Sequence, residues 1–459
     1  MNTLWDKSLP LDEVVHRFTV GDDPSTDLAL VALDCVASAA HARTLAAAGL
    51  LGDADLAALL AALRAAHDQA LAGRFTIDPT QEDCHTALEQ WLTERVGDTG
   101  KRIHLGRSRN DQVLVALRLA LRAGLFDLAL RTQSLASALH GFATRHADAP
   151  LPGYTHLRRA MPSSFGQWAG AYAQGLGEEL EAAAGVAVRL DRCPLGAGPG
   201  FGVPLPLDRA LTARLLGFSR VQVNPIDAIN SRGRDALGVL DWLVSVAGQL
   251  ERLSWDVALY STEEFGYLKL PVAFTTGSSA MPQKRNPDVV ELLRANCRRL
   301  RALRDEVLGV SSGLPSSYHR DLQLAKHPSL EALRVGSGLL EIARRLVEAL
   351  EPDRARAAAA CTPELYATHA AYQRAATGEL SSRQTFRDAY QAVAAEVLAG
   401  RFVPPPAPSA PALGAPERLE LPALGKELAA LGERWREPAR RAETAEAAVF
   451  EIPSKEGGR

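Results

Sequence analysis

The sequence predicts an all-α protein of three domains with a long central helical bundle. Apolar residues recur at steps of three and four along most of the 459-residue chain, which is the spacing of one face of an α-helix. The alternating pattern of a half-buried strand is nearly absent. At about 150 residues per domain, the length corresponds to about three domains. A hydrophobic content of 47% is enough for a large buried core.

The charge balance and the N-terminus exclude several classes of protein. Lysine plus arginine number 51 and aspartate plus glutamate 54, so the chain lacks the basic charge of a dedicated nucleic-acid binder. No window of about 18 residues is apolar and uncharged, and the N-terminus has no apolar signal core. The five cysteines include no CxxC pair, which indicates free thiols without a disulfide framework or a zinc site. We therefore expect a cytoplasmic protein that binds neither nucleic acid nor membrane.

The N-terminal domain is expected to span residues 1–106. Its main feature is the Ala- and Leu-rich stretch 28–72, whose apolar residues follow helical spacing. Glycine and polar residues then cluster at 97–109, a composition that separates structural elements. We place the first domain boundary in that cluster.

The central domain, 107–360, is expected to hold the long bundle. Leucines of the stretch 110–147 form one stripe. A segment of about 28 residues extends about 42 Å at about 1.5 Å per residue, longer than a compact domain is wide. Such helices favour an oligomer whose subunits share one bundle. The other predicted helices of this domain are 163–192, 208–217, 235–262, 288–311 and 329–360.

The C-terminal domain is expected to span residues 361–459. Its proline-rich segment 403–416 is typical of a stiff connector, and whether this segment is ordered is left open. A short and highly charged helical segment is expected after the connector.

The loop 276–288 carries the most informative side chains. Pro287 stands where a first helical residue should, so Lys284, Arg285 and Asn286 crowd the start of a helix. Free N–H groups, the helix dipole and two cations can together hold a carboxylate or a phosphate. The alternative is an ordinary capped helix that follows a mobile loop.

Other loops carry polar side chains in front of predicted helices. The stretch 101–112 has four cations in nine residues, which fits a second anion site or a solvated basic turn capped by Ser108 or Asn110. The loop 153–159 contains His156, which could exchange protons near neutral pH, although a lone histidine is more often structural. The stretch 82–85 fits either a helix cap and its neighbour or part of a pocket wall, whereas the polar stretch 313–326 says little alone.

Taken together, these loops resemble the fumarase/aspartase superfamily. The stretch 277–287, Gly-Ser-Ser-Ala-Met-Pro-Gln-Lys-Arg-Asn-Pro, matches the signature of that superfamily. Within it, Gly-Arg-Ser-Arg-Asn-Asp-Gln at 106–112 and Gly-Tyr-Thr-His at 153–156 are similar to motifs of argininosuccinate lyases. Two further stretches add to the match, 82–85 and 318–326.

The resemblance covers roughly residues 20–400 and implies both an assembly and a reaction. The assembly is a homotetramer of all-helical, three-domain subunits, with each active site built from loops of three subunits. The reaction is a carbon–nitrogen β-elimination of arginine biosynthesis that cleaves argininosuccinate to arginine and fumarate, with no metal or organic cofactor. Two alternatives are a sister lyase that releases fumarate from adenylosuccinate or aspartate, and a non-catalytic scaffold like the delta-crystallins.

The resemblance also assigns roles to residues. This elimination needs a strong base, cations that stabilise the carboxylate as it becomes an aci-dianion, and an acid for the departing nitrogen. The match implies that Ser278 is the base and that His156, oriented by Glu291, is the acid or part of its relay. Lys284 and Asn286 would stabilise the dianion. The other matched positions would contact the substrate: Arg109, Asn110 and Thr155 on the succinate half, Arg232, Tyr318, Gln323 and Lys326 near the other carboxylates, and His85 as a wall of the pocket.

Three departures from the family pattern bear on the amino half of the substrate. Leu105 replaces a threonine, and Asn230–Gly233 replaces a Ser-Asp-Arg-Asp run and so lacks two carboxylates. Asp23 aligns with a substrate-binding serine. Whether these departures change the substrate is left open.

Overall fold

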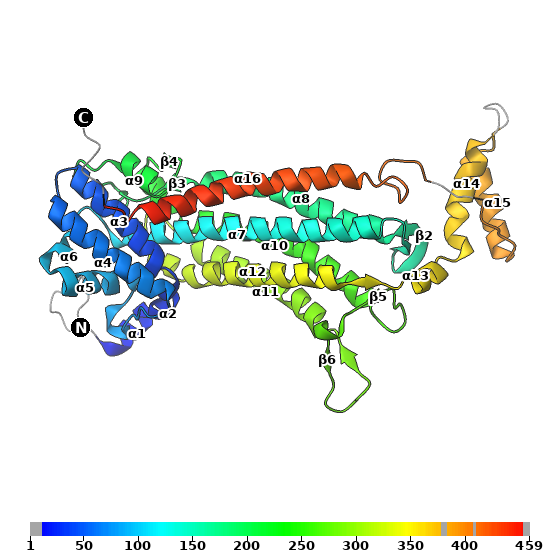
Figure 1. The fold of residues 1–459 in the computed structure, drawn as a ribbon, viewed down its shortest axis with the longest axis horizontal. Helices are drawn as coiled ribbons and strands as arrows, with labels where there is room; N and C mark the ends of the chain where they lie inside the picture. Colours follow the sequence, from blue (N-terminus) through cyan, green and yellow to red (C-terminus); the bar gives the residue numbers. More distant parts are fainter. Residues whose placement is uncertain (1–11, 378–382, 407–409, 453–459) are drawn as a thin grey trace.

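The computed structural model describes residues 12–377, 383–406 and 410–452. Figure 1 shows an elongated molecule in which long helices follow the long axis and shorter helices gather at one end. Strands occur in the described part of the chain only as short two-stranded pairs. The predicted all-α fold class is therefore confirmed.

The short helices at one end come from the N-terminal quarter of the chain. The predicted stretch 28–72 contains two helices with a break at 48–52. Gly49 adopts a φ of 71° in this break, a left-handed conformation that glycine reaches without a Cβ clash. The helices of this region are α1 (Glu13–Val20), α2 (Asp23–Thr26), η1 (Asp27–Ala29), α3 (Val31–Ala47), α4 (Asp53–Leu71), η2 (Pro79–Gln81), α5 (Cys84–Val96) and α6 (Asp98–Arg102).

The long helices form the bundle that the leucine stripes predicted. The first begins at a capping box, in which the Ser108 hydroxyl accepts from the Asn110 amide and the Asp111 carboxylate accepts from the Ser108 amide. Apolar side chains of all these helices meet in one continuous cluster. The helices are α7 (Arg109–Arg145), α8 (Phe165–Leu190), α10 (Pro225–Tyr260), α11 (Asp288–Ser311) and α12 (Lys326–Ala349), with the short α9 (Arg209–Leu215) beside them.

Three predicted helix bounds in this bundle are wrong. Helix α10 begins at Pro225, ten residues before the predicted start, because the Asn224 side chain caps it. The predicted helix 329–360 ends at Ala349 and is followed by the strand β8 (Glu351–Pro352) and the helix α13 (Arg354–Ala360). Pro287 is the N-cap of α11 and not its first residue.

The C-terminal part of the chain returns along the bundle. The prediction of a short final helix is wrong, because α16 (Leu421–Ala448) has 28 residues and packs along α7 and α8. Its buried residues include Leu428, Leu431 and Trp435. Of the predicted connector 403–416, residues 407–409 lie outside the described residues.

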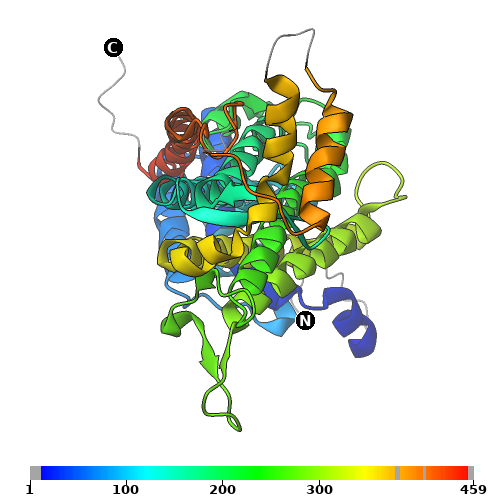
Figure 2. The same cartoon turned by 90° about the vertical axis from the view of Figure 1, so that its right-hand side faces the viewer.

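Two hairpins and one helical pair extend beyond the bundle (Figures 1 and 2). The strand pairs that matter for function are β1 (Pro150–Thr155) with β2 (Arg158–Ser164), and β6 (Thr276–Gly277) with β7 (Arg285–Asn286). Figure 2 shows the second pair projecting as an arm from the body of the molecule. The helical pair at the end opposite the N-terminal helices is α14 (Ala367–Ala376) and α15 (Phe386–Leu398).

The two ends of the chain share one apolar cluster. Residues of α3, α4 and α5 form most of it, and Val449 and Phe450 after α16 complete it. The Arg43 Nε donates to the Val449 carbonyl over 2.7 Å, a bond between residues 406 positions apart. The proposed domain boundaries at residues 106 and 360 stay a prediction.

All five cysteines are free. No single helix in the described ranges is long and apolar enough to span a bilayer. One bent pair, Glu13–Ala29 with Val31–Ala47 at 81°, passes that test by length and composition only.

Candidate active site

A pocket of about 560 Å³ lies where the N-terminal helices meet the first turns of the long helices. It collects residues from the start of α7, from α10, from the 3₁₀ helix η4 (Arg320–Gln323) and from the first residue of α12. Six of the eight predicted substrate-binding residues line it: Arg109, Asn110, Arg232, Tyr318, Gln323 and Lys326.

One wall of the pocket is a network of ion pairs around Arg109. Its guanidinium lies 3.0 Å from Glu82 and 3.1 Å from Asp83. The second Glu82 oxygen accepts from Arg320 over 2.9 Å, so Glu82 connects two walls of the pocket. Burial opposes charging of Arg109, but these carboxylates raise its pKa. The network therefore presents Arg109 in one orientation with its charge fixed.

Glu82 holds this position in a strained backbone conformation. It is buried and adopts a φ of 69°, which costs a residue with a Cβ about 1–3 kcal/mol. The stretch 82–85 was expected to form a helix cap or part of a pocket wall, but Glu82 was not among the predicted site residues. Arg320 was likewise unassigned, although it stands between the two matched positions Tyr318 and Gln323. Its position in that motif was the signal that could have identified it.

The opposite wall holds two buried cations that differ in their ion pairs. The Lys326 ammonium lies 2.6 Å from Asp27 and 2.8 Å from Asp23. Burial disfavours its charge, but the two carboxylates outweigh burial and raise its pKa. Arg232 is 4% exposed and stacks over the Tyr318 ring at 5.7 Å. It forms no ion pair with any carboxylate in the described ranges, and its buried Nε has no hydrogen-bond partner there.

Lys326 is therefore paired with two carboxylates, one more than its single charge needs, whereas Arg232 forms no ion pair in the part of the chain described. A buried cation without a counter-ion favours an anionic ligand. Arg232 is the better candidate for a substrate carboxylate.

His85 lies behind the pocket and not among its lining residues. It is buried, and its Nδ1 lies 2.9 Å from the Asp34 carboxylate. Burial lowers the pKa of His85, but Asp34 more than compensates and raises it. The Cys84 thiol lies 3.8 Å from the imidazole, and these three residues could hold a metal by spacing. Burial raises the pKa of Cys84 well above its usual range, which disfavours the thiolate that a metal needs.

One departure from the family pattern has a structural explanation. Ser231 stands where the family has aspartate, and its hydroxyl accepts from Arg118 over 2.7 Å. The buried Arg118 also lies 2.5 Å from Asp235, one helical turn after Ser231. A carboxylate on the same helix face thus compensates for the one missing at 231. At the next departure, a Cβ on Gly233 would lie 2.4 Å from the Ser311 Cβ, so this position accepts only glycine without rearrangement.

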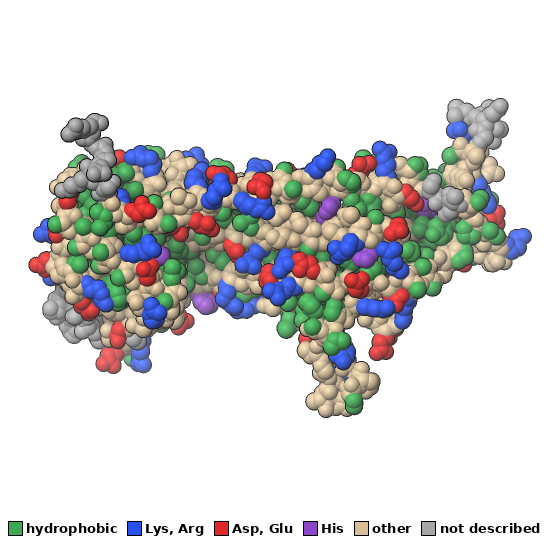
Figure 3. Space-filling view, in the orientation of Figure 1, with side chains coloured by type: hydrophobic (Ala, Val, Ile, Leu, Met, Phe, Trp, Pro, Cys, Tyr) green, Lys and Arg blue, Asp and Glu red, His purple; other side chains and the backbone are tan. Residues whose placement is uncertain are grey.

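The predicted base lies on the projecting arm, away from this pocket. The Ser278 hydroxyl accepts from the backbone amides of Ala280 and Met281 at 3.3 and 3.1 Å. Lys284 is exposed on the same arm, and Asn286 lies in β7 at its base. Figure 3 shows the arm extending away from the body. The residues that the sequence placed at a helix start are thus carried on a hairpin.

The predicted acid lies on the other hairpin, in the turn between β1 and β2. Thr155 pairs with Arg158, so His156 and Leu157 are the two central residues of the turn. Their φ values are 53° and 58°, the signs found in type I′ turns, where asparagine and glycine are usual. Leucine at such a position is a conformational outlier. The turn exposes both side chains, with Leu157 at 79%.

Within one chain, the arm with Ser278 and the turn with His156 both lie far from the pocket. Arg109 begins α7 and Thr155 follows its other end, and the 37 residues of α7 span about 55 Å. The arm precedes α11, whose opposite end packs on Gly233 beside Arg232 about 35 Å away.

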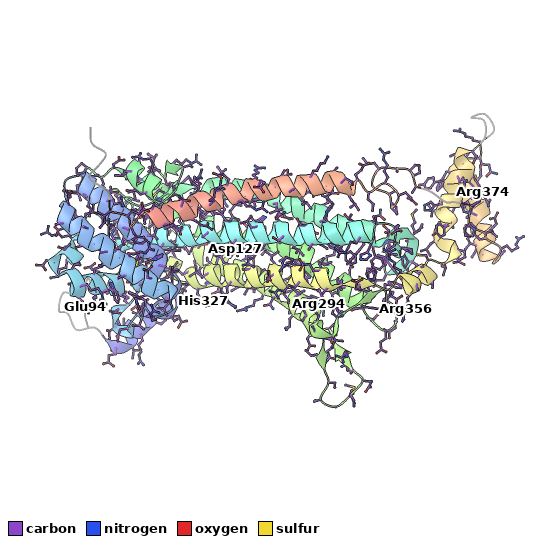
Figure 4. The ribbon with its side chains drawn as sticks, viewed as in Figure 1. Glu94, Asp127, Arg294, His327, Arg356 and Arg374 are labelled. Carbon is purple, nitrogen blue, oxygen red and sulfur yellow. The ribbon has the colours of Figure 1, made fainter. Side chains whose placement is uncertain are left out.

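In Figure 4, His327 marks the pocket end of α12, and Arg294 marks the end of α11 near the arm. Within the described ranges no hydrogen bond joins Glu291 to His156. A single chain therefore does not bring the predicted catalytic residues together.

The chain is similar to known lyases over most of its length. Residues 9–301 match the profile of a protein family described as Lyase. The argininosuccinate lyase of Sorangium cellulosum is 44% identical over 93% of this chain and 98% of that protein. The argininosuccinate lyase of Thermotoga neapolitana is 41% identical over 85% of this chain and 97% of that protein.

Solved structures share the fold at lower identity. A crystal structure of EDDS lyase in complex with formate has a TM-score of 0.80 at 21% identity, covering 96% of this chain and 95% of that one. A fumarate lyase:delta crystallin from Brucella melitensis bound to cobalt has a TM-score of 0.70 at 19% identity, covering 95% and 97%. With its matched profile, its close sequence relatives and these folds, the chain belongs to the argininosuccinate lyase family.

Proposed function

We propose that the protein cleaves argininosuccinate to arginine and fumarate by β-elimination, as a step of arginine biosynthesis in the cytoplasm. The observation that carries the proposal is the pocket, which gathers six of the eight residues matched to substrate-binding positions. The relatives at 41% and 44% identity, both argininosuccinate lyases, support the same reaction.

The proposed chemistry begins at Ser278. As an alkoxide it removes the proton from the carbon next to a carboxylate, and the two backbone amides that it accepts from stabilise the charged oxygen. The electron pair first spreads into that carboxylate, where Lys284 and Asn286 stabilise the dianion. It then forms the carbon–carbon double bond of fumarate as the carbon–nitrogen bond breaks. The departing guanidinium nitrogen takes its proton from His156 or from a relay that includes His156.

We propose that this site forms only in a homotetramer, from three subunits. One subunit supplies the pocket with Arg109 and Arg232, a second supplies the arm with Ser278, and a third supplies the turn with Thr155 and His156. The support is the length of α7 and α11, which keeps the turn about 55 Å and the arm about 35 Å from the pocket in one chain. Glu291 would orient His156 across a subunit boundary.

No cofactor is needed in this proposal. The acidity of the carbon next to the carboxylate and the guanidinium leaving group suffice once cations and a base are in place.

The test is the release of fumarate, followed by its absorbance at about 240 nm, from argininosuccinate, adenylosuccinate and aspartate offered separately. Ser278→Ala serves as the matched control, because it removes the proposed base alone. We expect fumarate from argininosuccinate only, and none with Ser278→Ala. Fumarate from another substrate alone would retain the lyase chemistry and overturn the specificity. Fumarate from none would favour a non-catalytic scaffold.

A further inference from the structure

Asp23 places a carboxylate in the wall of the pocket where the family has a substrate-binding serine. It begins the short helix α2, and its side chain is 16% exposed. Its Oδ2 lies 2.8 Å from the Lys326 ammonium. Among the pocket residues it is therefore both partly accessible to a ligand and close to the buried cations.

Asp23 is not needed to neutralise Lys326. Asp27 is fully buried, lies 2.6 Å from the same ammonium, and does not line the pocket. One carboxylate already balances one ammonium. The second carboxylate, Asp23, faces the open volume and is available to a cationic group that enters it.

Arg232 stands in the same wall with the opposite charge. It is buried and lines the pocket, and its positive charge lowers the pKa of Asp23 in part. A single ligand that carries an ammonium beside a carboxylate would satisfy both residues. Of the two halves of argininosuccinate, the succinate half carries only carboxylates, whereas the amino-acid half carries an α-ammonium next to an α-carboxylate.

We propose that Asp23 is a specificity-determining residue that binds the α-ammonium of the amino-acid half, while Arg232 binds the adjacent α-carboxylate. This inference rests on the proposed function and deepens it. The pocket then selects substrates with an intact α-amino acid and discriminates against those that lack the amino group. The departure from serine adds a charge–charge contact that a hydroxyl cannot provide.

The same contact makes substrate binding depend on pH. Burial and the neighbouring Asp27 raise the pKa of Asp23 to about 6, although Lys326 and Arg232 oppose the shift. Below that pH Asp23 gains a proton and loses its attraction for the ammonium, so KM rises. His104 also lines the pocket, and burial and the nearby Arg107 and Arg109 lower its pKa. The other charged groups around the pocket are Glu82, Asp83, Arg107, Arg109 and Arg320.

The experiment compares argininosuccinate with its desamino analogue, in which hydrogen replaces the α-amino group. The enzymes are the wild type, Asp23→Ser and Asp23→Asn, with Asp22→Ser as the control because Asp22 is exposed and its side chain caps nothing. For the wild type and Asp22→Ser we expect kcat/KM to favour argininosuccinate by about 10- to 100-fold, as for a hydrogen bond to a charged group. For both Asp23 variants we expect less than about threefold preference, through KM and with kcat nearly unchanged.

The dependence of KM on pH is a second measurement, and a purely structural role of Asp23 would not affect it. KM for argininosuccinate should rise below about pH 6 in the wild type and stay flat in Asp23→Ser. An unchanged preference in both Asp23 variants, or the same pH profile in all enzymes, would overturn the role of Asp23. Thermal unfolding of each variant shows whether the protein is folded.

Binding of the product separates this inference from the proposed function. Calorimetry with arginine and with its desamino analogue needs no turnover. If the wild type releases no fumarate but still prefers arginine through Asp23, the proposed reaction fails and the inference stands. If fumarate is released and arginine and its analogue bind equally, the reaction stands and the inference fails.

Discussion

Mixing two inactive variants tests whether the active site is shared between subunits. Ser278→Ala removes the proposed base from the arm, and His156→Asn removes the proposed acid from the turn. Each homotetramer should be inactive, because each of its sites lacks one of the two groups. The two chains are dissociated, combined in equal amounts and reassembled.

The proposed arrangement of subunits predicts how much activity the mixed tetramers regain. Helix α7 keeps the turn about 55 Å from the pocket and α11 keeps the arm about 35 Å from it, and the proposal takes the arm and the turn from different subunits. In a random mixture, the chain that supplies the arm carries an intact Ser278 with probability one half. The chain that supplies the turn carries an intact His156 with the same probability. About one quarter of the sites then hold both groups, so activity should return to about one quarter of the wild-type value.

The assay is fumarate release, with native mass spectrometry to verify that mixed tetramers have formed. If both groups came from the same chain, every site would retain one defect and no activity would return. Mixed tetramers with no activity would therefore refute the shared site. A chain with both substitutions, mixed with wild type, is the control for assembly.

Three further predictions concern single residues. Lys284→Met should lower kcat by about 10²- to 10³-fold with no change in the sedimentation of the oligomer, because a cation beside a developing dianion contributes a few kcal/mol; an unchanged kcat would exclude Lys284 from the mechanism. Asp235→Ala should lower the free energy of unfolding by about 3–5 kcal/mol in urea, because it leaves the buried Arg118 without its carboxylate. The exposed Asp241, which pairs with Arg304, is the matched control, and Asp241→Ala should cost less than about 1 kcal/mol. His85→Gln tests the raised pKa of His85: the stability that protonated His85 adds is complete below its unfolded pKa of 6.5 and is lost as pH rises through the higher folded value. The difference in unfolding free energy between wild type and His85→Gln should thus be larger at about pH 6 than at about pH 8.5, and a constant difference would contradict a protonated His85.

The long helices could be predicted because their apolar residues face the bundle along their whole length. The first turns of α10 could not, because polar residues interrupt the apolar spacing there: Arg232 lines the pocket, and Asn230 accepts from the Ser317 amide. Residues selected for a binding site are where sequence periodicity is expected to fail.

The full length of α16 was not predicted, because the helix contains residues that disfavour helices. Pro438 lies inside it, and Gly425 and Gly432 lower its intrinsic propensity. A Cβ on Gly425 would lie 2.7 Å from the His140 ring, and one on Gly432 would lie 3.1 Å from Gln133. Close packing against α7 therefore favours glycine at both positions, and the packing outweighs the propensity.

The motifs predicted site residues but not how far apart these residues lie within one chain. Ser278, His156 and Arg109 could be nominated from local sequence, since each motif is a short run of residues. That they occupy three distant places follows from the number of helical residues between them, which becomes clear only when the ends of α7 and α11 are known. The turn at His156 escaped prediction because neither His156 nor Leu157 is a usual residue for positive φ.

The docking of Val449 and Phe450 on the N-terminal helices has a consequence for how the chain is made. The carbonyl that Arg43 binds is synthesised 406 residues after the arginine itself, a delay of about 20–80 s at the usual rates of translation. During that time α3 and α4 lack the side chains that complete their apolar cluster. The packing of α3 and α4 is thus completed only after α16 has been synthesised. A nascent chain of this protein exposes apolar surface until Val449 and Phe450 emerge, which is the situation that chaperones serve.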